Sequence, residues 1–199
     1  YAGKEFLASE DERFRPVNLY TGPEGALYIV DMYRGIIQHK TYLTPYLKNE
    51  IKERNLTKPL SCGRIYKIIP QNSTPKPVRL SNDPAELLTA LHSANGWVRN
   101  KAQQLLTDGR LVSTIPVLRN NLKRTDSIML VIHSLWTLEG LEKLETADLM
   151  PLLEQNNEAI RIQALSVIPS VINKENVGEF LKVFKQLIEK HDELAAPYI

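Results

Sequence analysis

Hydrophobic and polar positions follow a strand-like pattern up to about residue 69. Residues 17–20 and 26–30 are short β-prone runs, and residues 21–25 between them, Thr-Gly-Pro-Glu-Gly, have the composition of a tight turn. Two such runs joined by a Gly/Pro turn predict a β-hairpin. Residues 63–69 alternate polar and apolar side chains, which predicts a further strand.

The stretch from Met32 to Cys62 is polar, rich in tyrosine and poorly periodic. Residues 43–54 within it have room for one short helix. A connection of this length between strands is unusual, so it is either functional or packs on another polypeptide.

Residues 70–79 contain three prolines and no periodicity, which is typical of a linker. Beyond them the apolar residues recur at helical spacing. The sequence therefore predicts three segments, which are a β-rich part at 1–69, a linker at 70–79 and a helical part at 80–199.

The helices of the third segment recur with a period of about 30 to 32 residues. This alignment makes Ala102, Ile132 and Ala164 equivalent. The repeating helices and their partners are expected at 97–106, 111–123, 128–136, 146–154, 159–168 and 175–190. Such pairs predict an α-solenoid, because one pair cannot bury its apolar face alone. The short period favours a compact HEAT-like α-α superhelix, so we expect a mainly α fold preceded by a small β-rich segment.

The amino-acid composition argues against several classes of function. The 199 residues are 43% hydrophobic and 24% charged, with a net charge of +2, as in an ordinary globular protein. Neither part of the chain is basic enough to predict nucleic-acid binding, and no apolar run approaches the roughly 20 residues of a membrane span. With one cysteine, the chain holds no intramolecular disulfide and no CxxCH haem site. The opening at Tyr1 led us to expect a piece of a longer protein.

Several segments resemble the end of a propeller domain in bacterial proteins of the membrane-bound dehydrogenase family, whose propeller is similar to that of quinoprotein glucose/sorbosone dehydrogenases. The matching segments are residues 5–9 (EFLAS), 14–17 (FRPV), 22–28 (GPEGALY), 31–35 (DMYRG) and 63–66 (GRIY). Residues 95–99 (NGWVR) and 135–141 (LWTLEGL) resemble the HEAT-like region that follows the propeller in that family.

This resemblance implies a partial propeller blade at 1–69, since a closed propeller needs roughly 4 to 8 blades of four strands. It implies a parent protein with a sugar-dehydrogenase-like propeller, a PQQ-like quinone and a c-type haem, none of them carried by this chain. It also implies export, and hence a periplasmic or otherwise extracytoplasmic location.

The candidate ligand-binding residues are Asp31, Tyr33, Arg34 and His39, which follow the second predicted strand within one polar stretch. In one interpretation this loop faces the propeller mouth and Arg34 binds an anion or a quinone carboxylate in bidentate fashion. In the other, Asp31 and Arg34 pair to hold the loop, and His39 is solvated. No catalytic residue is assigned.

Other conspicuous residues favour structural roles. The histidines at 92, 133 and 191 lie on separate predicted helices without the spacing of a metal site, so no metal is expected. Structural roles are also expected for Cys62, Trp97, Arg99, Trp136 and Arg161.

The sequence is compatible with three functions. The chain is a non-catalytic structural and interaction segment of a larger exported dehydrogenase, or part of the active-site propeller of a sugar-oxidising quinoprotein, or an independent HEAT-like adaptor. Whether it acts as an enzyme is left open. The expected partners are the rest of the parent polypeptide or another protein, and an open β edge predicts weak self-association.

Overall fold

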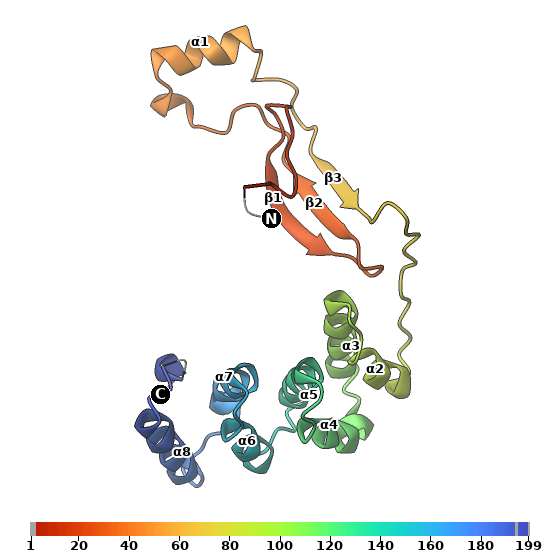
Figure 1. Cartoon of the computed structure of the whole chain (residues 1–199), viewed down its shortest axis with the longest axis vertical. Helices are drawn as coiled ribbons and strands as arrows, with labels where there is room; N and C mark the ends of the chain where they lie inside the picture. The colour runs from red at the N-terminus through yellow and green to blue at the C-terminus, as the bar shows by residue number, and fades with distance from the viewer. Residues whose placement is uncertain (1–2, 194, 199) are drawn as a thin grey trace. The chain divides into compact units, whose positions relative to one another are not determined.

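The structure, a computed structural model, describes residues 3–193 and 195–198. The chain divides into two compact units, Tyr1–Pro77 and Val78–Ile199, and the division falls within the proline-rich segment 70–79. The first unit holds a small antiparallel sheet and the second is helical (Figure 1). The expected mainly α fold with a small β-rich segment is confirmed.

Three antiparallel strands in the order β1-β2-β3 form the sheet. They are β1 (Pro16–Thr21), β2 (Leu27–Asp31) and β3 (Arg64–Ile68). The turn between β1 and β2 closes where the Gly22 N–H donates to the Ala26 carbonyl at 2.9 Å. Gly25 in this turn has a φ of 82°, which residues with a Cβ rarely adopt. The predicted hairpin and the third strand are thus confirmed.

The connection from β2 to β3 contains a short 3-10 helix, η1 (Lys40–Tyr42), and one α-helix, α1 (Pro45–Glu53). Helix α1 begins where sequence signals place it, because Thr44 Oγ1 accepts the Leu47 N–H at 3.2 Å and a proline takes the first helical position. The short helix expected at 43–54 is confirmed.

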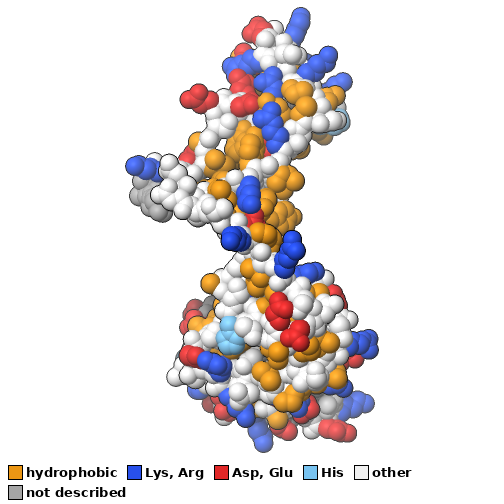
Figure 2. All heavy atoms as spheres, turned by 90° about the vertical axis from the view of Figure 1, so that its right-hand side faces the viewer, with side chains coloured by type: hydrophobic (Ala, Val, Ile, Leu, Met, Phe, Trp, Pro, Cys, Tyr) orange, Lys and Arg blue, Asp and Glu red, His pale blue; other side chains and the backbone are white. Residues whose placement is uncertain are grey.

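The sheet unit has a very small apolar core. Among its described residues, the buried apolar side chains are Ala26, Ile29 and Ile51. Many others are exposed, and Figure 2 shows hydrophobic side chains at the surface of this part of the chain. Examples are Phe6, Val17, Leu19, Tyr20, Ile37, Leu60 and Ile65. Since burial of apolar surface is the main force that stabilises a fold, this sheet gains little stability from its own residues.

The helical unit has two layers (Figure 1). The inner layer holds α3, α5 and α7 in a row, and the outer layer holds α2, α4, α6 and α8. The helices are α2 (Pro84–Ala90), α3 (Gly96–Asp108), α4 (Ile115–Leu122), α5 (Ile128–Gly140), α6 (Thr146–Leu153), α7 (Glu158–Val167) and α8 (Val177–Glu189). Short 3-10 turns are η2 (Val112–Thr114), η3 (Ile168–Ser170) and η4 (Ala196–Tyr198).

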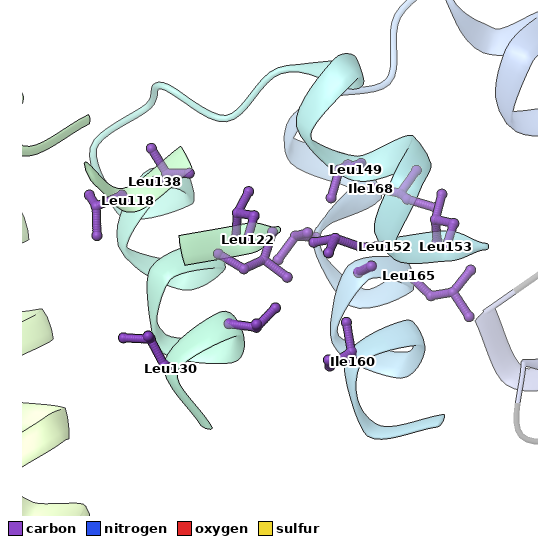
Figure 3. Packing of buried hydrophobic residues seen from close by; sticks show 14 of the residues in the cluster. Leu118, Leu122, Leu130, Leu138, Leu149, Leu152, Leu153, Ile160, Leu165 and Ile168 are labelled. Atoms are coloured by element: carbon purple, nitrogen blue, oxygen red, sulfur yellow. The ribbon is translucent and has the colours of Figure 1, made fainter. Parts of the chain in front are cut away.

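Leucine side chains fill the space between the two layers. Leu118 of α4, Leu130 and Leu138 of α5, and Leu149 of α6 are fully buried in one continuous cluster (Figure 3). The cluster extends through Ile160 of α7. The helical unit therefore has a core of its own.

The repeat equivalence expected for α5 is wrong by two residues. The three inner-layer helices begin at side-chain caps, which are Asn95, Ser127 and Asn157. Counting from these caps, Ala102 and Ala164 correspond to Ser134, and all three residues are fully buried. Ile132, which apolar character had aligned with them, is half-buried. Close packing between helices selects small side chains at this position, and an alignment of apolar letters does not detect that requirement.

Candidate functional site

Asp31 anchors the start of the loop that follows β2. Its side chain is 1% exposed, and Oδ1 accepts the backbone N–H groups of Arg15 at 2.7 Å and of Tyr33 at 2.8 Å. The second oxygen, Oδ2, is buried and has no hydrogen-bond partner among the described residues. The expected alternative of an Asp31–Arg34 ion pair is wrong, because the carboxylate bonds backbone groups instead. Asp31 thus fixes the conformation of the loop.

Tyr33 is held from two sides. Its backbone has a φ of 48°, and its hydroxyl donates to Asp11 Oδ2 at 2.8 Å. The Arg64 guanidinium lies 3.5 Å from the centre of its ring, within cation–π distance. The hydrogen bond to Asp11 is the main cause that raises the pKa of Tyr33. Tyr33 therefore joins the segment before β1 to β3 and keeps its phenolic proton.

Arg34 and His39 lie in different surroundings. Arg34 lines an open pocket of about 520 Å³, and His39 is not among the residues that line it. Its walls are mostly apolar, and the lining residues are Met32, Arg34, Ile36, Ile37, Gln38, Lys40, Leu43, Ile51 and Thr57. His39 is exposed and caps η1, where Nδ1 accepts the Thr41 N–H at 3.3 Å.

The four predicted residues are thus neighbours in sequence, but the structure does not bring them into one constellation. Asp31 is engaged inside the fold, Tyr33 with Asp11 and Arg64, and His39 with η1. Arg34 lines the apolar pocket, as does a second cation, Lys40. This pocket has the chemistry to hold an anion with an apolar body.

A second buried carboxylate, which sequence reasoning missed, lies in the β1–β2 turn. Glu24 has a side chain that is 4% exposed, and its Oε1 accepts the Tyr28 hydroxyl at 2.6 Å and pairs with Lys67 Nζ. These two partners, Lys67 first, lower the pKa of Glu24 to about 2. The carboxylate is therefore ionised at neutral pH, where it ties the turn to β3 and has no proton to donate. The only sequence signal was a glutamate four residues before a tyrosine.

Polar side chains also connect the inner-layer helices. His133 Nδ1 on α5 lies 2.8 Å from Gln103 Oε1 on α3, and Trp136 Nε1 donates to Gln163 Oε1 on α7 at 2.7 Å. Burial, and secondarily Arg99, lowers the pKa of His133. These bonds support the structural roles expected for His133 and Trp136.

Arg99 and Arg161 clamp the loops before their own helices. Arg99 Nη1 donates to the Ser93 carbonyl at 2.6 Å, and Arg161 Nη1 donates to the Gln155 carbonyl at 2.8 Å. Arg161 also forms a nearly buried ion pair with Asp192. The expected structural role of both arginines agrees with these contacts.

Cys62, possible metal ligands and possible membrane spans are the remaining features to consider. Cys62 is half-buried, and its thiol donates to the Leu60 carbonyl at 3.3 Å. Across residues 3–193 and 195–198, no three histidine, cysteine or acidic side chains come together as metal ligands would. The described helices are all too short or too polar to cross a membrane.

Comparison with known proteins finds one similarity. Residues 1–72 match a domain of unknown function (DUF7133), a stretch that contains all three strands and α1. No curated protein matches the chain, and no solved structure does so.

Proposed function

We propose that the chain is a non-catalytic structural and interaction segment of a larger exported dehydrogenase. In this proposal the helical unit is a HEAT-like scaffold, and the three strands complete a propeller-type sheet whose other strands come from the parent protein. The quinone and haem of the parent protein lie outside this chain. The proposal rests on the resemblance of residues 5–66 and 95–141, together with one structural observation, the open and apolar sheet.

Both outer strands of the sheet lack a partner on one side. The order is β1-β2-β3, so β1 and β3 each present one free edge in the described part of the chain. All six residues of β1 are exposed, and Ile65 on β3 is 71% exposed. Sheets of this size are stable when an apolar face is covered by further structure. Added strands would satisfy the free backbone groups and cover these side chains at the same time.

Two positions with the same residue type and equal exposure give a matched test. Leu19 on β1 is 58% exposed and Leu60 in a loop is 57% exposed. In the chain alone, Leu19→Lys and Leu60→Lys should each change the free energy of unfolding by less than about 0.5 kcal/mol. In the longer protein, Leu19→Lys should lower the melting temperature because it places a charge against the added strand. Leu60→Lys should not. Equal melting temperatures for the two variants of the longer protein would overturn the proposal.

The Arg34 pocket supports the second candidate, a part in the substrate or cofactor site of a sugar-oxidising quinoprotein. Its two cations, Arg34 and Lys40, stand beside apolar walls that suit an amphipathic anion. In the longer protein, Arg34→Ala would then lower turnover with aldoses and added quinone or weaken quinone binding. The structural proposal predicts unchanged kinetics, and it predicts no turnover by the chain alone.

The third candidate, an independent HEAT-like adaptor, differs in what surrounds the chain. A dehydrogenase segment predicts propeller strands before it or a CxxCH motif after it in the full reading frame. An adaptor predicts neither.

A further inference from the structure

The side-chain cap that starts α5 and α7 recurs after α8. In each case a side-chain oxygen accepts the N–H of the third residue along. The pairs are Ser127 with Leu130 at 3.4 Å, Asn157 with Ile160 at 3.1 Å, and Asp192 with Ala195 at 3.2 Å. Ala195 is buried, as are Leu130 and Ile160. Asp192 and Ala195 therefore have the features of the first turn of another inner-layer helix.

The outer-layer helices repeat with a spacing of 31 residues. Leu118 of α4, Leu149 of α6 and Phe180 of α8 occupy equivalent positions, and all three are fully buried. Four residues later the pattern breaks, because Leu122 and Leu153 are buried whereas Phe184 is only half-buried. The side of α8 that carries Phe180 is therefore buried in the core. The neighbouring side, which carries Phe184, is not fully covered.

On α4 and on α6, the corresponding side contacts the helical pair that follows in the chain. Arg119 of α4 lies one residue after the core position Leu118, and its Nε donates to Asp148 of α6 at 3.2 Å. Thr146, on the corresponding side of α6, accepts the Asn176 side-chain N–H at 2.9 Å through its hydroxyl. Both contacts join one pair to the pair that follows.

On α8 the same side carries an apolar stripe, which we call the α8 stripe. It consists of Val177, Leu181, Phe184 and Ile188, which recur every three or four residues. Leu181 corresponds to Arg119 and is 50% exposed, and Ile188 is more exposed. Helix α8 already buries one face in the core, so a second apolar face on it is typical of an interface that another element covers.

We propose that the α8 stripe is the docking face for one further antiparallel helical pair, which starts at Asp192 and packs as α5 and α6 pack after α4. The interface continues the one already formed between successive pairs, and Ala195 is seated where the inner helix would begin. The inference rests on the helical unit alone and is independent of the sheet.

The test replaces residues 193–199 of the chain with a copy of its own central helical pair. A copy of residues 128–154 placed directly after Asp192 supplies an inner and an outer helix with the native cap. We expect amide hydrogen exchange in α8 to slow at least about tenfold relative to the unextended chain. Leu181→Glu in the extended chain should abolish this protection, whereas Gln186→Glu should preserve it. Gln186 is an exposed residue of the same helix that lies off the stripe.

Three results would overturn the inference. The first is unchanged exchange in α8 upon extension, and the second is equal loss of protection in both glutamate variants. The third is a dimer of the unextended chain that Leu181→Glu dissociates in sedimentation, which would assign the stripe to a second copy. Melting of the unextended Leu181→Glu chain checks folding, and it should match wild type because Leu181 is half-exposed.

Discussion

Two buried carboxylates hold the sheet unit together where apolar packing is sparse. Asp31 accepts two backbone N–H groups, which belong to Arg15 before β1 and to Tyr33 after β2. Glu24 bonds Tyr28 and Lys67 and thereby ties the β1–β2 turn to β3. The hydrogen bonds of these two side chains thus stabilise a unit that has few buried apolar residues.

Removal of the Asp31 carboxylate should loosen the loop after β2. Asp31→Ala leaves two N–H groups without their acceptor, and each unsatisfied buried group costs about 1–3 kcal/mol. Hydrogen exchange at the Tyr33 amide should therefore become faster. Asp31→Asn keeps the Oδ1 acceptor and should have a smaller effect. Exchange in Asp31→Ala at the wild-type rate would show that the carboxylate is not the anchor.

Acid should weaken the sheet unit through Glu24. The pKa of this carboxyl is about 2 in the folded chain, against 4.5 for an unperturbed glutamate. Between these values the unfolded chain binds more protons, so stability is complete above pH 4.5 and is lost as the pH falls toward 2. Protection of the β2 and β3 amides should decline over this range in wild type and much less in Glu24→Gln. Parallel declines would contradict the assignment.

At the scale of elements, the sequence pattern predicted where strands and helices lie but not how side chains join them. Turn residues, alternation and helical spacing located β1, β2, β3 and α1, because these signals act locally. The register of α5 was missed because it depends on Ser134, a small residue whose role appears only when helices are packed. Glu24 was missed because its partner Lys67 is distant in sequence.

The bond between Trp136 and Gln163 should stabilise the packing of α5 against α7. Gln163→Ala removes the acceptor of the half-buried indole N–H, and such a loss costs about 1 kcal/mol. Urea unfolding followed by tryptophan fluorescence should show the shift. Gln186→Ala on the exposed side of α8 is the control, and an equal shift there would indicate that helix propensity alone is being measured.

At the scale of the whole molecule, the two units differ in how many apolar side chains they bury. The helical unit encloses a continuous core, whereas the described residues of the sheet unit bury three apolar side chains. The candidate site could be predicted from the sequence only as a segment. Asp31, Tyr33, Arg34 and His39 do lie together in the chain, but their directions depend on distant residues such as Asp11 and Arg64.

The free edges of β1 and β3 predict weak self-association of the chain, because an unpaired edge accepts a strand from another copy. Sedimentation velocity at rising concentration should show a larger species that Leu19→Lys suppresses and Leu181→Glu does not. A monomer at every concentration would contradict this prediction.

Hydrogen exchange at the two sheet edges tests the central claim most directly. The Gly22–Ala26 bond sets the alternation of the antiparallel ladder, so the amides of Thr21 on β1 and Ile65 on β3 point away from β2. They should exchange freely in the isolated chain. In the longer protein at least one of them should exchange at least about tenfold more slowly, because an added strand accepts its hydrogen bond. Equally fast exchange of both amides in the longer protein would contradict the claim that this sheet is completed by strands from outside the chain.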